Sequence, residues 1–186
     1  MTWWLVDPRL QLEKTQVDRF GPREVNMPVE RLKQFLESEG VKYVTISHSQ
    51  AFTAQEIASS AHIPGKELAK TVMVKIDGDM AMAVLPADDR VDRDLLKQAA
   101  GADTVELASE SDFKGLFPNC ELGAMPPFGN LWDMEVFADE RLAEDEEIAF
   151  NAGSHSELVR LAWEDFVHLV EPEIVHLTTR ENVLTG

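Results

Sequence analysis

The segment CELGAMPPFGNLW, residues 120–132, combines residue types that shape a rigid loop. Its adjacent prolines, Pro126 and Pro127, fix φ and remove backbone donors, whereas its glycines permit φ > 0 and close backbone approach. No helix or strand period runs through these residues. The segment is therefore either a rigid connector or a loop shaped to hold a ligand.

Lys70 is a second residue whose place in the sequence suggests chemistry. On an extended strand, residues 70, 72, 74 and 76 share one face, and here they are Lys, Val, Val and Ile. Lysine is almost never fully buried without a partner. Its side chain therefore either extends to solvent at the strand end or points into a pocket that needs positive charge. Lys75 falls on the opposite face and is expected to be an ordinary solvated residue.

The histidines and the single cysteine are the remaining candidates. His155, in NAGSHSEL, follows Gly153 at the mouth of a predicted strand, where it either serves a site or only hydrogen-bonds a loop. His48 precedes a predicted helix and is expected in a turn. Cys120 could act as a nucleophile, but a lone buried thiol is commonly inert. The five histidines lack metal-ligand spacing and nucleotide-binding motifs are absent, so no metal and no cofactor is predicted.

Hydrophobic periodicity predicts the elements that position these residues. An amphipathic helix is expected over 29–39, a strand over 42–46, and a helix over 54–61 behind a capping box of Thr53 and Glu56. Residues 68–86 hold two β-type runs around DGD, which predicts a hairpin. The second run is apolar on both faces and is therefore expected to be a central strand.

The second half of the chain alternates in the same way. Asp92 is expected to start a helix, and Ser109 with Asp112 to cap a short one that ends near Phe117. Strands are predicted over 103–108, 131–139, 147–153 and 156–163, the last strand, and a final short helix over 164–170. The predicted fold class is α/β of the α+β type, a mixed, largely antiparallel β-sheet flanked by short helices.

The charge of the chain limits its partners. The formal net charge is −17, and residues 131–186 hold 14 acidic but only three basic side chains. Phosphate backbones are bound mainly through Lys and Arg, so a protein that coats DNA or RNA broadly is disfavoured. A local contact with RNA would use the basic residues of the middle segment, which are Lys66, Lys70, Lys75, Arg90, Arg93 and Lys97.

Composition also suggests where the protein works. No apolar run approaches the roughly 20 residues that a membrane-spanning helix needs. The opening MTWWLVDPRLQ lacks the basic region of a signal peptide, and the single cysteine excludes an internal disulfide. We therefore expect a reducing, cytoplasmic setting and no membrane partner.

Five segments, in this order, resemble the YbaK/prolyl-tRNA-editing family, the relatives of the editing domain inserted in bacterial prolyl-tRNA synthetases. They are HSQAFTAQEIA (48–58), LAKTVMVKIDG (68–78), VLPADDRVDRDLL (84–96), GAMPPFG (123–129) and NAGSHSELVRLAWEDF (151–166). The ordered set is much more specific than any one member. The resemblance covers residues 28–172, which leaves 1–27 as an N-terminal appendage and 173–186 as a C-terminal tail.

The resemblance implies hydrolysis of wrongly charged aminoacyl-tRNA. It implies that Gly123 and Pro127 belong to the wall of an aminoacyl pocket, that Lys70 is the active-site lysine, and that His155 is the histidine near the last strand. Alanine-selective members tend to have Asn after the lysine, where this chain has Thr71, so alanine specificity is left open. The expected catalytic residues are Lys70, Gly123 and His155, and the expected substrate-binding residues are His48, Thr71, Met125, Pro126, Pro127 and Gly153.

Two functions of different kinds follow from these observations. The first is a trans-editing deacylase that removes a small amino acid and contacts the acceptor end of the tRNA weakly and locally. The second is a non-catalytic module that binds an aminoacyl end, a small amino acid or a synthetase. Lys70, the glycine loop and His155 favour the enzyme, whereas the −17 charge and residues 1–27 would suit an adaptor.

Overall fold

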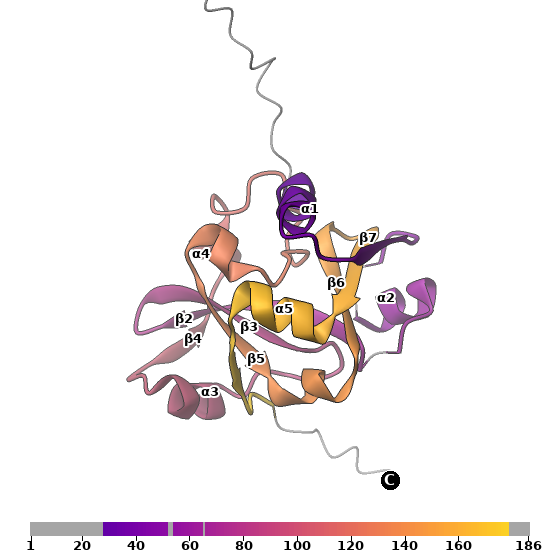
Figure 1. Cartoon of the computed structure of the whole chain (residues 1–186). Helices are drawn as coiled ribbons and strands as arrows, with labels where there is room; N and C mark the ends of the chain where they lie inside the picture. Colours follow the sequence, from indigo (N-terminus) through magenta and orange to yellow (C-terminus); the bar gives the residue numbers. More distant parts are fainter. Residues whose placement is uncertain (1–27, 52–53, 65, 179–186) are drawn as a thin grey trace, which may run out of the picture.

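A computed structural model of the chain describes residues 28–51, 54–64 and 66–178. Within these ranges, strands form one sheet in the order β1-β7-β6-β2-β3-β5-β8, and β4 pairs with β2 beside this path. Four of the strand pairs are antiparallel and three are parallel. Short helices lie around the sheet (Figure 1). The predicted fold class is confirmed.

The strands are β1 (Tyr43–Ser47), β2 (Leu68–Ile76), β3 (Asp79–Pro86), β4 (Val105–Leu107), β5 (Glu135–Asp139), β6 (Glu147–Ser154), β7 (Glu157–Ala162) and β8 (Glu173–Val175). The α-helices are α1 (Pro28–Ser38), α2 (Ala54–Ala61), α3 (Arg93–Ala100), α4 (Glu110–Phe113) and α5 (Trp163–Val170), and two 3-10 helices span Gly129–Trp132 and Glu140–Glu144. In the part of the chain that the structure describes, no helix is long and apolar enough to cross a membrane.

Strands β2 and β3 form the predicted hairpin, in antiparallel register from Ala69 opposite Pro86 to Ile76 opposite Asp79. Strand β3 is buried from residue 81 onward and lies between β2 and β5, as expected of a run that is apolar on both faces. Strand β2 also pairs with β6, in parallel, close to its first residue. Lys70 therefore lies where the hairpin meets β6, remote from the hairpin turn.

Local capping accounts for where two helices begin. The carboxylate of Asp92 accepts hydrogen bonds from the backbone N–H groups of residues 94 and 95 at the start of α3. Ser109 and Asp112 form the predicted capping box of α4, but this helix ends at Phe113 rather than near Phe117. Thr53 lies outside the described residues, so the cap predicted for α2 stays a prediction.

The chain departs from the prediction around β5 and after α5. Leu131 and Trp132, predicted as strand, belong to a 3-10 helix, and β5 begins only at Glu135, because Asp133 reverses the chain with a φ of 56°. Strand β7 is not the last strand, since β8 follows and pairs in parallel with β5. Residues 173–175 therefore form an edge strand of the sheet. The predicted appendage, residues 1–27, lies outside the described residues.

Phe128 fixes the glycine- and proline-rich segment to the core. Its side chain is fully buried, and its ring lies 6.2, 5.5 and 5.7 Å between centroids from the rings of Phe35, Phe150 and Phe166. Aromatic pairs at such distances contribute beyond their buried area. Residues 124–129 are all buried. The segment is therefore packed against the core from one end, which holds the preceding residues in a fixed position.

Candidate active site

Strand β6 carries a bulge that holds the glycine- and proline-rich loop. The β6–β7 register shifts between Asn151 and Ser154, because two additional residues lie on β6. One of them is Gly153, whose φ of 101° suits glycine. The Gly153 N–H donates to the carbonyl of Ala124 at 2.8 Å, and its carbonyl accepts from the N–H of Glu121 at 2.9 Å. The bulge thus turns strand backbone towards the loop.

His155 holds the same loop through two further contacts. Its backbone N–H donates to a carboxylate oxygen of Glu121 at 2.5 Å, and its ring Nε2 lies 2.7 Å from the carbonyl oxygen of Leu122. A carbonyl oxygen carries no proton, so Nε2 must be the donor. The residue is only 8% exposed. The buried ring therefore holds the loop through Nε2, and the role expected for His155 in a site stays a prediction.

Gly123 lies at the exposed tip of this supported loop. Its φ is +83°, a backbone conformation that residues other than glycine rarely adopt. A Cβ placed there would lie 3.7 Å from Cε1 of His155. The N–H of Gly123 has no protein acceptor among the described residues. The loop thus presents a backbone donor beside the His155 ring, in a position that two hydrogen-bonded supports define.

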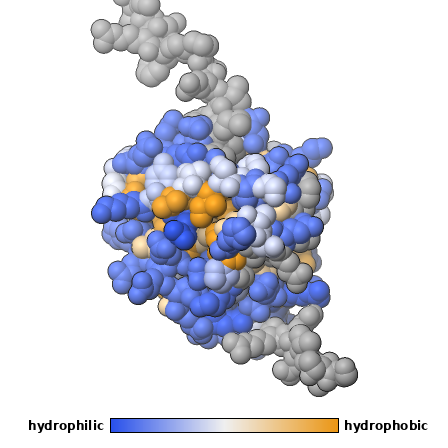
Figure 2. Space-filling view, turned by 90° about the vertical axis from the view of Figure 1, so that its right-hand side faces the viewer, coloured by the Kyte–Doolittle hydropathy of each residue, from blue (hydrophilic) through white to orange (hydrophobic). Residues whose placement is uncertain are grey.

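The segment before α2 lies along the turn between β6 and β7. The N–H of His48 donates to the carbonyl of Ser156 at 3.0 Å, and the N–H of Ala51 donates to that of His155 at 3.1 Å. Nδ1 of His48 lies 2.7 Å from the carbonyl oxygen of Ser49, so it is the protonated nitrogen. The face that carries α2, β6 and β7 is largely hydrophilic, with apolar side chains gathered near its centre (Figure 2).

The half-buried side chain of Lys70 reaches the backbone of the loop after β3. Its Nζ donates to the carbonyl of Ala87 at 3.0 Å. Burial lowers the pKa of Lys70, and the nearby carboxylates of Asp89 and Asp88 oppose this shift. An ammonium group has three donors, so two remain for a ligand. Lys75, by contrast, is no ordinary solvated residue, because it forms an ion pair with Asp112 at 2.5 Å.

Several buried polar side-chain atoms have no hydrogen-bond partner among the described residues. They include Nε2 of His48, Oγ1 of Thr71 and Oδ1 of Asn151. Thr71 faces the other side of β2 from Lys70, because neighbouring residues of a strand point to opposite faces. Buried polar groups normally have partners, so such atoms are candidates for contact with water or a ligand. Asn151 was missed from the sequence, although a polar residue inside the apolar run EIAFNAG was a visible signal.

The remaining predicted loop residues lie towards the core. Met125, Pro126 and Pro127 are buried, and Met125 borders a cavity of about 260 Å³. Cys120 borders the same cavity, where burial raises the pKa of its thiol to about 12. A thiol with such a pKa is a poor nucleophile at neutral pH. The structure therefore does not support the nucleophile interpretation of Cys120.

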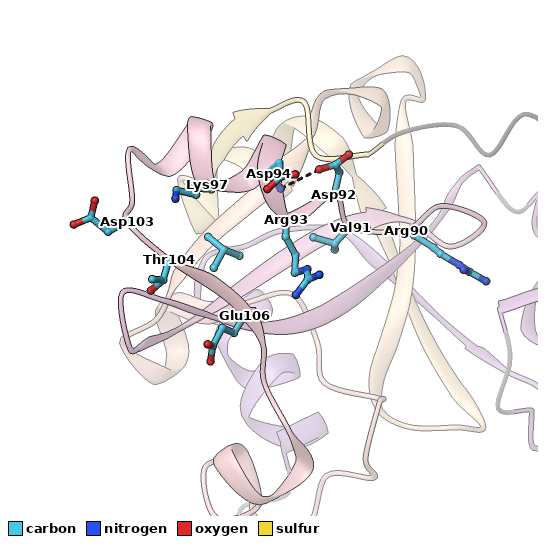
Figure 3. A pocket seen from close by; sticks show the side chains of 10 residues that line it. Arg90, Val91, Asp92, Arg93, Asp94, Lys97, Asp103, Thr104 and Glu106 are labelled. Atoms are coloured by element: carbon cyan, nitrogen blue, oxygen red, sulfur yellow. Dashed lines mark hydrogen bonds between the residues drawn. The ribbon is translucent and has the colours of Figure 1, made fainter.

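A separate open pocket of about 630 Å³ lies beside α3 and β4 (Figure 3). It contains three of the basic residues that the sequence suggested for RNA contacts, together with four carboxylates. These charged residues are Arg90, Arg93, Lys97, Asp92, Asp94, Asp103 and Glu106. The mixture of signs does not favour a polyanion. Across the described ranges, no group of three or more His, Cys, Asp or Glu residues is arranged to hold a metal ion.

The match with known proteins covers these same elements. A model of the family described as "Aminoacyl-tRNA editing domain" matches residues 48–169, from the segment before α2 to α5. The chain belongs to this family. The predicted family is thereby confirmed, and so is the predicted enzyme class, aminoacyl-tRNA deacylase.

Individual relatives agree with the family match. The chain is 29% identical to the multifunctional Ser/Thr-tRNA deacylase ProXp-y of Escherichia coli K12 over 152 residues, which cover 79% of this chain and 90% of the relative. It is 32% identical to the proline–tRNA ligase of Bacillus mycoides over 89 residues, 48% of this chain but only 16% of the ligase. A solved structure of a candidate trans-editing enzyme for prolyl-tRNA synthetase has the same fold, with a TM-score of 0.71, 19% identity, and coverage of 82% of this chain and 98% of that one.

We predict that Gly123→Val lowers kcat/KM for deacylation about tenfold or more, because the Gly123 N–H can stabilise the oxyanion formed in ester hydrolysis and loss of one such donor costs at least that much. At a φ of +83° valine is strained by roughly 1–2 kcal/mol or more, which displaces the Gly123 N–H. Gly78→Val is the matched control, because Gly78 has a φ of +97°, has open space around it and lies in the hairpin turn. It should lose similar stability but keep its activity. A folded Gly123→Val variant with parental turnover would place the site elsewhere.

We also predict that Cys120 reacts slowly with thiol reagents. At pH 8 a thiol with a pKa of about 12 is about 0.01% thiolate, whereas an ordinary cysteine is roughly one quarter thiolate. Labelling by a disulfide reagent at pH 8 should therefore be at least about tenfold slower than in the same protein unfolded in urea. Equal rates in the two states would show that the thiol is accessible and that its pKa is not raised in the folded protein.

Proposed function

We propose that this protein hydrolyses, in trans, the ester bond of a mischarged aminoacyl-tRNA that carries a small amino acid, with serine the first candidate. The observation that carries the proposal is the Gly123 loop, whose N–H has no protein acceptor among the described residues and which Gly153 and His155 hold in place. The serine candidate rests on the 29% identity to the Ser/Thr-tRNA deacylase. Thr71 in place of the asparagine of alanine-selective members agrees with a substrate other than alanine.

Hydrolysis of an aminoacyl ester requires few catalytic groups from the protein. An aminoacyl ester is already reactive, so the site must orient a water molecule and stabilise the oxyanion that forms when the water attacks the carbonyl carbon. A fixed backbone donor such as the Gly123 N–H can do this, and one such donor is worth about 10²–10³ in rate where measured. The neighbouring hydroxyl of the terminal ribose can relay the proton: it accepts one from the attacking water and gives one to the leaving ester oxygen, so that the products are the free amino acid and the uncharged tRNA. An acid–base triad is therefore not required.

His155 supports catalysis as a positioning residue in this proposal. Its Nε2 donates to the Leu122 carbonyl, so this nitrogen is not available to accept a proton from water. The ring instead fixes the peptide that precedes Gly123. The catalytic role expected for His155 from the sequence thus becomes the support of the oxyanion donor.

Lys70 supplies positive charge to the bound acceptor end. Its ammonium group keeps two N–H donors beyond the one that contacts Ala87. It would hold the terminal phosphate or the ester carbonyl, and its partial burial strengthens such a contact by reducing competition from water. His48, Thr71, Met125, Pro126 and Pro127 remain proposed substrate-binding residues, of which the first two present buried polar atoms.

The fixed loop also suits selection by size. The buried residues Pro126 and Pro127 restrict the φ angles of the loop, and Phe128 packs its ring into the core. Because binding alone discriminates poorly between side chains that differ by a methylene group, an editing site gains more from a wall that excludes the larger one. We propose that the loop is this wall. The tRNA itself is held weakly, and a synthetase partner and a cytoplasmic setting remain part of the proposal.

We predict that the purified protein hydrolyses seryl-tRNA, and more weakly other aminoacyl-tRNAs with small side chains, in the presence of EDTA. The expected independence of metal follows from a mechanism that uses backbone donors and a lysine. The measurement is loss of labelled amino acid from a panel of mischarged tRNAs. Decay of the whole panel at the rate of the buffer control would reject the enzyme and leave the non-catalytic binding module. Loss of activity with EDTA would reject only the independence of metal.

We further predict that Lys70→Ala lowers kcat/KM by about tenfold to a hundredfold. The change removes a charge-assisted contact worth roughly 1.5–3 kcal/mol, and each 1.4 kcal/mol corresponds to one decade. Lys75→Ala is the control, because Lys75 lies on the opposite face of β2 and pairs with Asp112. It should cost some stability but little activity. Equal kcat/KM in the two variants, both melting near the parental temperature, would remove Lys70 from the site.

A further inference from the structure

The loop that receives Lys70 is short and hydrogen-bonded to the hairpin. The Ala87 N–H donates to the carbonyl of Leu68 at 2.7 Å, and the Asp89 N–H donates to the carbonyl of Pro86 at 3.0 Å. Both carbonyls belong to the strands of the hairpin. The loop therefore has little freedom, and it places a carboxylate, Asp89, close enough to Lys70 to oppose the lowering of the Lys70 pKa by burial.

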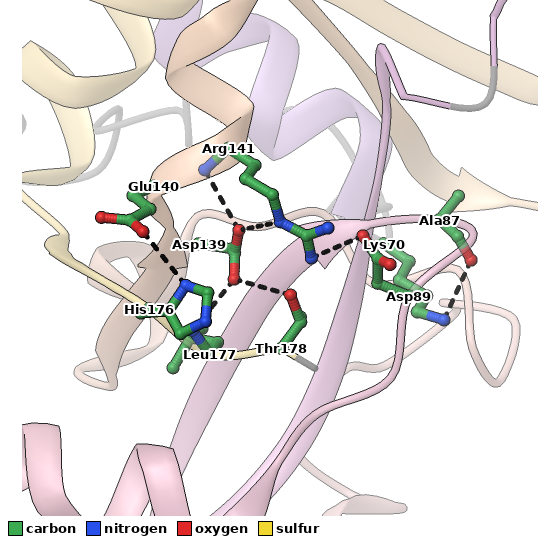
Figure 4. Close-up of polar contacts among 9 residues, drawn as sticks. All are labelled: Lys70, Ala87, Asp89, Asp139, Glu140, Arg141, His176, Leu177 and Thr178. Carbon is green, nitrogen blue, oxygen red and sulfur yellow. Dashed lines mark hydrogen bonds and ion pairs between the residues drawn. The ribbon is translucent and has the colours of Figure 1, made fainter. Parts of the chain in front are cut away.

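Asp89 is nevertheless engaged by a different cation. Its Oδ2 lies 2.7 Å from Nη2 of Arg141, and both side chains are only 15% exposed. Among the described residues, no carboxylate lies within 4.0 Å of Nζ of Lys70, which contacts the Ala87 carbonyl instead. Figure 4 shows Asp89 between the Arg141 guanidinium and the Lys70 side chain. Two cations thus flank one carboxylate, and Arg141 holds it.

Arg141 is itself fixed by a buried carboxylate. Asp139, at the end of β5, is fully buried, and its Oδ1 accepts from Nε of Arg141 and from the Arg141 backbone N–H, both at 3.1 Å. Its Oδ2 accepts from the N–H of Leu177 at 2.9 Å and from the hydroxyl of Thr178 at 3.1 Å. A buried carboxylate with four donors is held firmly, because loss of any donor leaves charge uncompensated.

The geometry of arginine suits this arrangement. Nε faces Asp139 while Nη2 faces Asp89, so one planar guanidinium spans two carboxylates that belong to separate parts of the chain. A lysine in the same place would have one compact charge and could not span them in this way. The arrangement fixes the direction in which the Asp89 carboxylate points.

We infer that Arg141 is a positioning residue which holds the Asp89 carboxylate away from Lys70 and so keeps the Lys70 ammonium available to the phosphate or carbonyl of the substrate. This inference rests on the role proposed above for Lys70. Without Arg141, the Asp89 carboxylate is free to pair with Lys70 and competes with the substrate for it. Leu177 and Thr178, beyond the end of the family match at residue 169, contribute to catalysis indirectly by fixing Asp139.

The test is a set of variants assayed on seryl-tRNA under kcat/KM conditions. Arg141→Gln should lower kcat/KM about tenfold, because Asp89 then pairs with Lys70. Asp89→Asn alone should stay within about twofold of the parent, and the double variant Arg141→Gln with Asp89→Asn should recover to within about threefold. In a Lys70→Ala background, Arg141→Gln should have no further effect. Arg160→Gln, which removes the ion pair of Arg160 with Glu147 on neighbouring strands, is the control.

The alternative is that Arg141 only stabilises the fold. In that case Asp89→Asn would lower activity as Arg141→Gln does, the double variant would not recover, and the Arg141→Gln loss would persist in the Lys70→Ala background. Any of these results overturns the inference. If Lys70→Ala alone has no effect, the role of Lys70 fails together with this inference, whereas the deacylase activity itself stands. Because the Asp89→Asn arm leaves Asp139 and its donors intact, it remains informative even if Arg141→Gln does not fold.

Discussion

The pair of backbone hydrogen bonds between Gly153 and the loop at 121–124 is the constraint on which the site depends. In a strand of regular register, the N–H and the carbonyl of Gly153 would both pair with the neighbouring strand. The bulge frees both groups for the loop, where the Ala124 carbonyl accepts from the Gly153 N–H and the Glu121 N–H donates to the Gly153 carbonyl. His155, two residues further on, then reaches the Leu122 carbonyl. The bulge, the histidine and the glycine tip are thus one device, in which each part would be misplaced without the others.

Much of the architecture could be predicted from local patterns. The hairpin, its central second strand and the capped starts of α3 and α4 follow from periodicity and capping residues, which act over a few neighbouring positions. Strand β8 could not be found in this way, because three residues carry no period and become a strand only through pairing with β5. The predicted start of the fifth strand, at Leu131, was wrong for a similar reason, because the chain reverses at Asp133.

The candidate site, too, could be predicted only in part from the sequence. Lys70, Gly123, Gly153 and His155 could be proposed as site residues because their residue types are unusual for their surroundings and because the ordered motifs resemble a family. What the sequence could not give is how the histidine is used. Its ring supports a loop, a fact that depends on a contact between residues 33 positions apart. The Asp139–Arg141–Asp89 network was missed entirely, because three ordinary charged residues acquire meaning only when the ends of β3, β5 and the chain after β8 meet.

Strand β8 affects where the C-terminal boundary of a shortened protein should be placed. The family match ends at residue 169, which makes a boundary there look natural, yet such a boundary removes the strand that covers β5. The exposed edge would run through Val136, Phe137 and Ala138, an apolar stretch with free backbone donors and acceptors. Unprotected edges of this kind invite intermolecular pairing, so the shortened protein should tend to aggregate. Fusion partners are therefore better attached beyond Thr178, and expression fragments should also end beyond this residue.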